Sequence, residues 1–426
     1  MSTPMSIEET IANMTRESIP GMLLSNVTII GADTDQNPSV DHPHMNIVLA
    51  LLRNNQYLWC YRRGHPTIYG TFYMGTKVQR IDRGGGGGGG NGDDNALIFA
   101  LPNENQQMRF AIKWVSIQRY REKGMNMQED PYNEIKIKSH ICRFMRHDQI
   151  INSGIIIPIG VVSNETQVFL QGHGNISGDG DGDDHQRYFF ILSQLANGGD
   201  LFDAVTGSGD MDIAGDGDAD ADADGDDNNG DNRLMDIVTI RHLFRQMVRA
   251  IHCLHQIRVF HRDLSVENFV IHNGNDSNND SSNDQRIYVI DFGQARIVDP
   301  NDGDIFRHDN KYFGKPSYTP PELIQGHINL HWKKVDIWAL GITLYYMLLR
   351  QLPHWSVSNG ECCLTNVNDP SFQLFIRQGM LATWIRRSNA AIPDEVLEVL
   401  QGMLQEDPTR RLSTEEILNH PWLVAS

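Results

Sequence analysis

Cysteine is scarce in this chain, and its few cysteines form no pattern that would indicate disulfides or a metal site. Only five occur among 426 residues, of which Cys362 and Cys363 are adjacent and the others lie far apart. Disulfide-rich secreted domains and zinc sites need regularly spaced cysteines, so both classes are excluded. We expect a soluble protein of a reducing compartment, either the cytoplasm or the nucleus.

Long apolar runs and long basic runs are also missing. The longest apolar stretches, MNIVLALL and GIIIPIGVV, are far shorter than the roughly 20 residues of a membrane-spanning helix. The start, MSTPMSIEET, has neither the basic residues nor the apolar segment of a signal peptide. No stretch is rich in lysine and arginine in the way that nucleic-acid surfaces are. We therefore expect neither a membrane nor a nucleic acid among the partners.

Negative charge is abundant but unevenly placed. The formal net charge is −18, and residues 172–185 and 207–232 carry 4 and 10 aspartates with no lysine or arginine. The rest of the chain therefore has a charge balance that is ordinary for a soluble enzyme. These two segments, together with residues 84–95 and 273–284, consist mainly of Gly, Asp, Asn and Ser. Such compositions bury too little apolar surface to offset chain entropy, so we expect four flexible insertions.

The remaining sequence alternates between strand and helix patterns. Residues 110–116 (FAIKWVS) and 187–195 (RYFFILSQL) are rich in aromatic and β-branched residues, which predicts buried strands. Residues 237–257 have apolar side chains at helical spacing, and residues 333–349 are apolar almost all round, which predicts two core helices. A strand-rich first part followed by a helix-rich remainder predicts an α+β protein with two lobes.

Several short motifs occur in a fixed order along the chain. They are AIK with Lys113, the helical segment DPYNEIKIKSHI with Glu134, HRDLSVEN with Asp263 and Asn268, DFG with Asp291, PPE with Glu322, DIWALG with Asp336, and DPTRRL followed by HPW with Arg411. Each motif alone is weak, but the ordered set is specific. Over residues 56–423 the sequence resembles the eukaryotic protein kinases, and most of all a serine/threonine kinase with an HRDLSxEN-type catalytic loop.

The resemblance implies a two-lobed protein-kinase-like fold. A β-rich N-lobe with one main helix would span residues 56–193, a hinge residues 194–199, and an α-helical C-lobe residues 200–423. Residues 1–55 would be an N-terminal extension, to which we assign no role. The implied reaction is the transfer of the ATP γ-phosphate, with Mg²⁺, to a protein hydroxyl.

The implied catalytic residues have a chemical rationale of their own. Phosphoryl transfer needs positioning and charge neutralisation more than covalent help. Lys113, held by Glu134, would grip the α and β phosphates. Asn268 and Asp291 would supply the oxygen ligands that Mg²⁺ prefers. Asp263 would orient the attacking hydroxyl and accept its proton.

The segment ILSQLANGGDLF resembles the hinge that holds adenine. The resemblance implies that backbone groups of Gln194 and Ala196 meet the base edge. Asp200 would bind the ribose hydroxyls, and Ala111 and Val270 would enclose the ring. The sequence therefore predicts a nucleotide site built from both lobes.

Two positions of this implied site depart from the family pattern. The phosphate-covering segment RRGHPTIYGTF offers Gly64 and Gly70 instead of three closely spaced glycines, with Tyr69 and Phe72 at the aromatic and apolar places. Glycines let backbone amides approach phosphates closely, so fewer glycines predict weaker ATP binding. Ser193 stands at the rear of the adenine pocket, where a bulkier residue is usual, and predicts a roomy back pocket.

The catalytic loop departs from the pattern at Ser265, where the serine/threonine family has a lysine for the γ-phosphate. In GKPSYTPPE, Lys315 occupies the place of the threonine that meets this lysine. We infer that the two have exchanged places, with Lys315 supplying charge near Asp263 and Ser265 hydrogen-bonding to it. The alternative is that Lys315 points into solvent, as most lysines do.

The activation segment, residues 294–313, contains no serine or threonine. Arg262 precedes Asp263, an arrangement in which an arginine often pairs with an activating phosphate. We expect an acidic side chain, with Asp309 best placed, to substitute for that phosphate.

Substrate class is inferred from the resemblance alone. The catalytic loop lacks the AAR or RAA arrangement of tyrosine kinases, which favours serine or threonine as the acceptor. Glu267 and Asp200 match positions that attract basic residues in some relatives, which favours a protein substrate with a basic context. We expect the chain to act as a monomer.

Two other functions compete with an active protein kinase. A pseudokinase, serving as a nucleotide-binding scaffold or signalling adaptor, is favoured by Ser265 and the poor glycine loop, while the intact catalytic and metal-binding residues speak against it. A small-molecule phosphotransferase with a kinase-like fold is the second. Glu322 with Arg411, and the helical motifs around them, favour a protein substrate instead.

Overall fold

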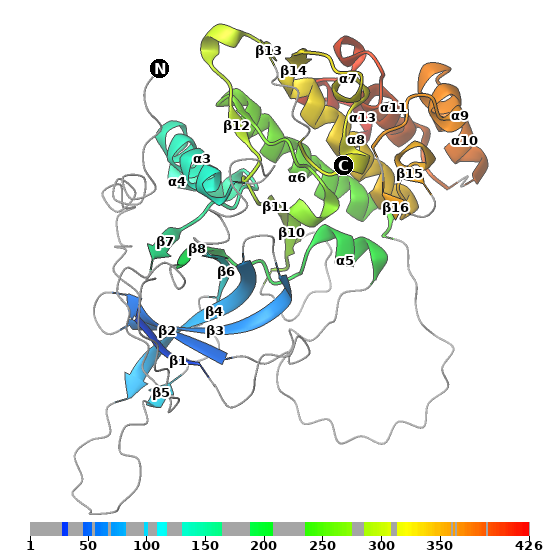
Figure 1. Cartoon of the computed structure of the whole chain (residues 1–426). Coiled ribbons are helices and arrows are strands. Elements are labelled where there is room, and N and C mark those ends of the chain that lie inside the picture. Colours follow the sequence, from blue (N-terminus) through cyan, green and yellow to red (C-terminus); the bar gives the residue numbers. More distant parts are fainter. Residues whose placement is uncertain are drawn as a thin grey trace, which may run out of the picture. The chain divides into compact units, whose positions relative to one another are not determined.

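The computed structural model of this chain describes residues 28–32, 46–52, 56–66, 70–81, 98–100, 109–116, 130–163, 188–207, 235–274, 285–307, 313–358, 361–362, 364–388 and 391–425. The four predicted insertions lie outside these ranges, apart from Gly207 and residues 273–274. The chain divides into two compact units (Figure 1). Unit 1 comprises residues 1–127 and 157–195, and unit 2 comprises residues 128–156 and 196–426.

Unit 1 is built on one antiparallel sheet of eight strands (Figure 1). The strands are β1 (Thr28–Ala32), β2 (Asn46–Leu52), β3 (Gln56–Pro66), β4 (Gly70–Ile81), β5 (Ile98–Ala100), β6 (Arg109–Ser116), β7 (Gly160–Ser163) and β8 (Tyr188–Gln194). Their order is β1-β2-β3-β4-β6-β8-β7, and β5 pairs with β4. Strands β6 and β8 confirm the two strands predicted from their aromatic and β-branched residues. Strands β1 and β2 belong to the N-terminal extension, and β2 pairs with β3, so part of this extension continues the sheet.

Unit 2 holds the helices of the described part of the chain. They are α3 (Pro131–Phe144), α4 (His147–Asn152), α5 (Leu201–Thr206), α6 (Ile237–Gln256), α7 (Pro321–Ile324), α8 (Trp332–Leu349), α9 (Pro370–Phe372), α10 (Leu381–Ser388), α11 (Asp394–Met403), α12 (Thr414–Leu418) and α13 (Pro421–Val424). Helices α3, α6 and α8 confirm the predicted helical segments. Asp236 starts α6 by accepting hydrogen bonds from the N–H groups of Val238 and Thr239, a typical N-cap.

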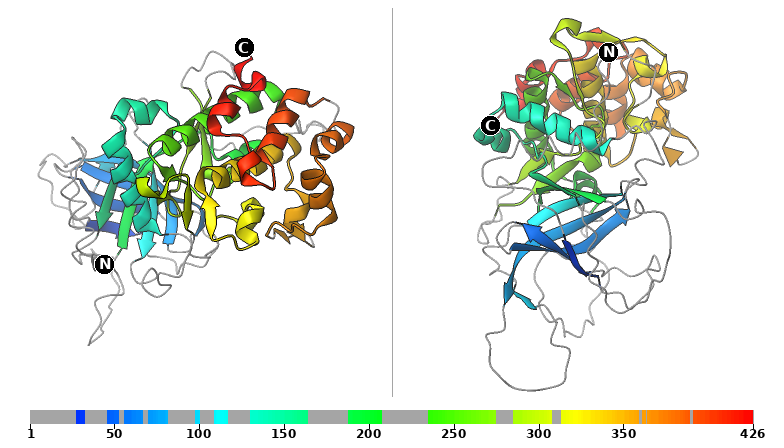
Figure 2. Two further views of the ribbon diagram at one scale, coloured as in Figure 1. Left: turned by 90° about the horizontal axis from the view of Figure 1, so that it is seen from above. Right: turned by 60° about the vertical axis from the view of Figure 1, so that its left-hand side comes forward.

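The core of unit 2 forms where α6 and α8 pack together, with α11 against α8 and α12 and α13 against α6 (Figure 2). Nearly every residue of α8 is buried, which follows from its apolar composition on all sides. Phe244 of α6 packs on Trp422 of α13, with ring centroids 5.9 Å apart. This packing provides a rigid base for the loops that carry the polar side chains of interest.

Four small two-stranded sheets in unit 2 border those loops. They pair β9 (Val259–Phe260) with β12 (Arg296–Ile297), β10 (Phe269–His272) with β11 (Arg286–Val289), β13 (Ile305–Arg307) with β14 (Asn329–His331), and β15 (Val357–Ser358) with β16 (Glu361–Cys362). The loop after β9 therefore leads directly to β10, and the turn after β11 leads to β12.

Helix α3 groups with unit 2, whereas the kinase resemblance places it in the first lobe. Polar contacts also link it to other parts of that unit. The N–H of Asp130 donates to the carbonyl of Gly293, and Nε2 of His140 lies 2.8 Å from the carbonyl oxygen of Ile257. Within the described residues, no helix combines the length and the apolar character that crossing a membrane requires.

Candidate active site

The loop between β9 and β10, residues 261–268, is fixed by one buried carboxylate from α8. Asp336 accepts a hydrogen bond from the N–H of His261 at 3.0 Å and another from the N–H of Arg262 at 3.0 Å. It also lies 2.9 Å from Nε2 of His255 on α6. Asp336 is only 1% exposed and accepts from the N–H groups of both His261 and Arg262. It therefore fixes the backbone conformation just before Asp263.

A second buried side chain, His261, ties this loop to the turn after β11. Its Nε2 lies 3.1 Å from the carbonyl oxygen of Ile290, and its Nδ1 accepts from the N–H of Asp263 at 3.4 Å. Burial lowers the pKa of His261, which keeps the imidazole neutral. A neutral ring with its proton on Nε2 satisfies both contacts, so the loop is held by a fully paired polar group.

Asp263 emerges from this loop with both carboxylate oxygens engaged. Oδ2 accepts from Nε2 of Gln294 at 3.0 Å, and Oδ1 accepts from the backbone N–H of Lys315 at 3.2 Å. Burial and the nearby negative charge of Asp291 raise the pKa of Asp263 to about 6, although the Lys315 ammonium acts in the opposite direction. A carboxylate that binds a proton near neutral pH is suited to act as a general base.

Asn268 and Asp291 lie at the two ends of the hairpin β10–β11. Nδ2 of Asn268 donates to the carbonyl of Asp263 at 2.7 Å, which leaves the side-chain oxygen as the atom that can face a cation. Oδ1 of Asp291 accepts from the N–H of Gly293 at 3.1 Å. A carboxylate and an amide oxygen are a donor set that fits Mg²⁺, which takes few protein ligands and completes its shell with water and phosphate oxygens.

Lys315, expected to replace the lysine that is absent at position 265, forms an ion pair in this region. The Lys315 ammonium lies 2.6 Å from Oε1 of Glu267, and both side chains are about 40% exposed. Burial of Glu267 acts to raise the pKa of that carboxyl, but the charge of Lys315 and its hydrogen bond outweigh burial and lower it. Lys315 is thus held against the catalytic loop rather than extended into solvent.

Ser265 does not form the predicted hydrogen bond with Lys315. Its side chain is fully buried, and Oγ has no hydrogen-bond partner of normal geometry among the described residues. It lies close enough to Glu267 to contribute to the lowered pKa of that carboxyl. The physical reason is charge, because the Glu267 carboxylate attracts the ammonium more strongly than a neutral hydroxyl can.

Gly314 allows the Lys315 segment to approach the catalytic loop. A Cβ atom at this position would lie 2.5 Å from the carbonyl oxygen of Arg262, and the backbone is left-handed with φ +71°. The N–H of Gly314 donates to Oε1 of Gln294 at 2.7 Å, while Nε2 of the same side chain donates to Asp263. Gln294 therefore joins the two segments, a role that no sequence motif signalled.

In unit 1, the residues expected to contact the nucleotide lie on adjacent strands. Lys113 and Ala111 are two residues apart on β6, and therefore on one face of the sheet. Ala111 pairs with Ser193 of β8, and Gln194 follows Ser193 at the end of that strand. Gly70 begins β4. Lys113 is 8% exposed, and Ser193 is half-buried.

In unit 2, Asp200 and Val270 form a β-bridge, so these two predicted nucleotide contacts lie side by side. Oδ1 of Asp200 accepts from the N–H of Asp203 and caps α5. Burial and the charges of Asp203 and Glu267 raise the pKa of Asp200. Ala196 lies in the linking stretch before α5 and is half-buried.

Glu134 lies on α3 in unit 2 and is 6% exposed, whereas its expected partner Lys113 belongs to unit 1. Tyr69 and Asp309 lie outside the described residues. The predictions that concern these two residues therefore stay predictions from the sequence.

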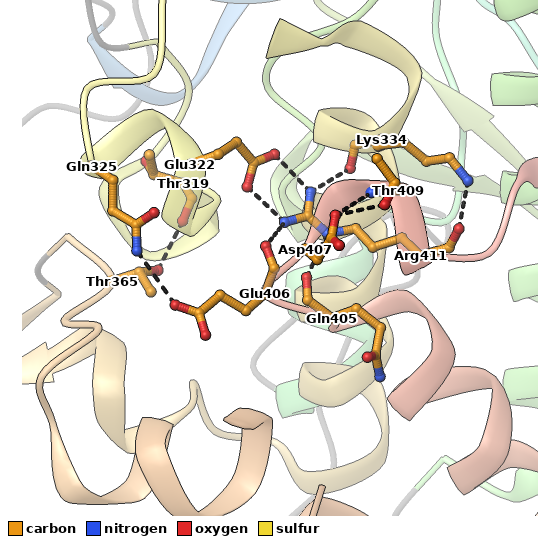
Figure 3. A network of polar contacts seen from close by, with 10 residues as sticks. All are labelled: Thr319, Glu322, Gln325, Lys334, Thr365, Gln405, Glu406, Asp407, Thr409 and Arg411. Atoms are coloured by element: carbon orange, nitrogen blue, oxygen red, sulfur yellow. Dashed lines mark hydrogen bonds and ion pairs between the residues drawn. The ribbon is translucent and has the colours of Figure 1, made fainter. Parts of the chain in front are cut away.

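A buried ion pair supports the segment that follows Lys315. Nη1 and Nη2 of Arg411 lie 2.7 and 2.6 Å from the two carboxylate oxygens of Glu322 (Figure 3). Arg411 also donates to the backbone carbonyls of Lys334, Gln405 and Glu406. Every donor of the guanidinium therefore faces an oxygen, which makes burial of this charge tolerable.

Comparison with known proteins places these features in a family. The model of a family described as "Protein kinase domain" matches residues 89–423. Similar curated proteins include a probable serine/threonine-protein kinase of Dictyostelium discoideum, calcium-dependent protein kinase 1 of Oryza sativa subsp. japonica and testis-specific serine/threonine-protein kinase 3 of Mus musculus.

The similarity to these relatives is low, and it covers only part of most of them. Each is 27% identical, over 240, 267 and 237 residues respectively. The aligned part is 56%, 62% and 56% of this chain, and 22%, 41% and 69% of the three relatives. The chain thus spans less than half the length of the first two.

Proposed function

Because this chain belongs to the protein kinase family, we propose that it is an active serine/threonine kinase that transfers the γ-phosphate of ATP, with Mg²⁺, to a protein hydroxyl. The observation that carries this proposal is the environment of Asp263. Its buried carboxylate has a pKa of about 6 and lies near both Asp291 and the Lys315 ammonium. This environment supports assigning Asp263 as the base, Asp291 as a metal ligand and Lys315 as the cation of one site in unit 2.

In this proposal each residue has one task. Asp263 accepts the proton of the attacking hydroxyl. Asn268 and Asp291 would hold Mg²⁺, which offsets the charge of the phosphates when bound. Lys113 would grip the phosphates, with Glu134 as the partner that the resemblance implies. The nucleotide residues are those that the hinge resemblance implies, namely Ala111, Gly70, Ser193, Gln194, Ala196, Asp200 and Val270.

Lys315 supplies the positive charge that Ser265 cannot. Its backbone N–H is anchored on Asp263, and its ammonium rests on Glu267. A lysine side chain is long and flexible, so it can exchange Glu267 for a phosphate oxygen while its backbone stays fixed. Preorganised charge near a transferring phosphoryl group stabilises the transition state by several kcal/mol.

The acceptor is proposed to be a serine or threonine of a protein, in a basic context. Glu267 favours a nearby cation, and in the structure Lys315 already fills that place. A basic substrate residue would therefore compete with Lys315 for Glu267, and Asp200 remains the second acidic position. The enzyme is proposed to act as a soluble monomer in the cytoplasm or nucleus.

The test is transfer of labelled phosphate from ATP to a mixed serine/threonine peptide library with Mg²⁺. The unmodified chain is compared with Asp263→Asn, which keeps the shape of the side chain but removes the base. Transfer by the unmodified chain and its loss in the variant support the proposal. Binding of nucleotide without transfer would replace the proposal with a pseudokinase scaffold.

A further inference from the structure

Helix α3 is fastened to the turn after β11 through one side chain, Asn133. Its amide nitrogen Nδ2 lies 3.0 Å from the carbonyl oxygen of Phe292, 3.3 Å from that of Gly293 and 2.5 Å from that of Ala295. At the same end of the helix, the N–H of Asp130 donates to the carbonyl of Gly293. A single amide thus serves three carbonyls of one short turn.

Other contacts also hold the shape of this turn, among them those of Gln294 with Asp263 and Gly314. The N–H of Gly293 bonds to Oδ1 of Asp291, and the N–H of Ala295 bonds to the carbonyl of Phe292. Asp291 itself has a left-handed backbone with φ +62°. A residue other than glycine keeps such a conformation only where its surroundings enforce it. The hydrogen bonds from Asn133 hold the carbonyls of the residues that follow Asp291, and so help to keep Asp291 in its left-handed conformation.

The far half of α3 is fixed on the same side of the helix. His140 follows Asn133 by seven residues, or about two turns, so the two side chains share one face. Nε2 of His140 lies 2.8 Å from the carbonyl oxygen of Ile257, at the end of α6. With both halves anchored, α3 acts as a brace between α6 and the Asp291 turn.

We propose that Asn133 is a positioning residue for the metal site, holding the backbone that aims the Asp291 carboxylate without contacting the cation. This inference rests on the proposed function, since it takes Asp291 as a Mg²⁺ ligand. Asn133 directly precedes Glu134, so the same contacts fix the register of Glu134 relative to Asp291. Groups that orient a metal ligand in this way typically change metal affinity by about 10- to 100-fold when removed.

Asn133→Asp is the sharpest variant, because it keeps the shape of the side chain and replaces the donating amide with a carboxylate facing three carbonyl oxygens. The affinity of each variant for a non-hydrolysable ATP analogue is measured by calorimetry, once with Mg²⁺ and once with a chelator. We expect the Mg²⁺-dependent affinity to fall at least about tenfold, as for other groups that orient metal ligands. The affinity without metal should change less than about twofold, because the proposed role of Asn133 acts only through the metal ligand Asp291.

The matched control is Lys136→Gln, which changes the net charge by the same amount at an exposed position of α3. It should leave both affinities unchanged. Asn133→Ser, which keeps a shorter donor, should lie between the unmodified chain and N133D. Thermal unfolding of each variant shows whether it is folded, and N133S replaces N133D in the comparison if the latter unfolds.

The outcomes separate this inference from the proposed function. Equal loss of affinity with and without Mg²⁺ in the folded variants would reveal a general structural role and overturn the inference. Normal Mg²⁺-dependent binding by N133D, in a chain that transfers phosphate, would overturn the inference alone. An unmodified chain that binds nucleotide with no Mg²⁺ dependence and transfers no phosphate would overturn both.

Discussion

The Lys315 ammonium lies 2.6 Å from Oε1 of Glu267, two residues along the loop from the buried hydroxyl of Ser265. Under the proposed function, this relationship would compensate for the lysine that is absent at position 265. Lys315 belongs to the segment after β13, and its backbone N–H donates to Asp263. The two segments approach closely because Gly314 leaves room for the carbonyl of Arg262.

Lys315→Thr should lower kcat by about 10²- to 10³-fold, because one preorganised charge at a transition state contributes that much. The stability should change by only about 0–1 kcal/mol, since the lost ion pair with Glu267 is exposed. Peptide phosphorylation and thermal unfolding measure the two effects. Adding Ser265→Lys to Lys315→Thr should restore most of the activity.

A matched control is Lys333→Thr, which breaks a similarly exposed ion pair with Asp304. It should leave kcat unchanged. If the double variant Ser265→Lys with Lys315→Thr is as inactive as the single one, position 265 cannot host the cation and the exchange of places is wrong.

The pH dependence of the unfolding free energy should reflect the titration of the Asp263 carboxyl. Its pKa in the folded chain is about 6, above its ordinary value of 3.8, because of burial and Asp291. Between these values the folded chain keeps a proton that the unfolded chain has lost, so this residue destabilises the fold increasingly as pH rises from 4 to 6. The full effect corresponds to roughly 3 kcal/mol above that window.

Asp263→Asn should therefore gain stability relative to the unmodified chain as pH rises through this window, with denaturant unfolding as the measurement. The gain should be smaller than the full effect, because the new amide cannot accept from Gln294 and Lys315 together. The unmodified enzyme should lose kcat/KM about tenfold per pH unit below pH 6, as its base becomes protonated. A stability difference that does not vary with pH would mean that Asp263 has an ordinary pKa.

The buried ion pair of Glu322 and Arg411 should be the most sensitive polar contact of unit 2. Glu322→Gln leaves the guanidinium without its bidentate partner and should cost about 3–5 kcal/mol of unfolding free energy. Arg411→Lys should cost a comparable amount, because one ammonium cannot replace five directed donors. Denaturant unfolding measures both, and the exposed pair of Arg386 and Asp394 provides a control in which Arg386→Lys should change little.

Much of the fold could be predicted from the sequence, because its helices and strands are encoded locally. Strands β6 and β8 follow from their aromatic and β-branched residues, helix α6 from apolar residues at helical spacing, and helix α8 from apolar residues on all sides. The positions of Asp263, Asn268 and Asp291 follow from short motifs. Strands β1 and β2 were not predicted, because their sequence patterns are weak. Such segments form strands only when they can pair with a neighbouring strand, as β2 does with β3.

The contacts that link distant segments could not be predicted. Gln294 joins Asp263 to Gly314, and Asn133 joins α3 to the turn after β11, yet neither residue lies in a motif that names its partner. The preference of Lys315 for Glu267 over Ser265 is of the same kind. It depends on side-chain distances between segments about fifty residues apart, which only the folded chain defines.

The activation segment should not need a phosphate to hold its shape. The Arg262 guanidinium lies 4.0 Å from the centroid of the Phe313 ring, which is itself 3% exposed. Phe313 packs edge-on against Phe260, with ring centroids 5.6 Å apart, in a cluster that includes Phe306 and Trp332. A buried aromatic ring is an attractive partner for a guanidinium, so this contact holds Phe313 against Arg262 without modification.

Phosphatase treatment should therefore leave the rate of peptide phosphorylation within about twofold, since the cation–π contact is untouched. Phe313→Leu keeps most of the apolar volume but removes the ring from beneath Arg262. It should lower the rate several-fold while costing roughly 1–2 kcal/mol of stability. Asp309→Asn tests the acidic substitute that the sequence indicates. Inactivation by phosphatase would show that a phosphate, and neither of these side chains, holds the segment in its active form.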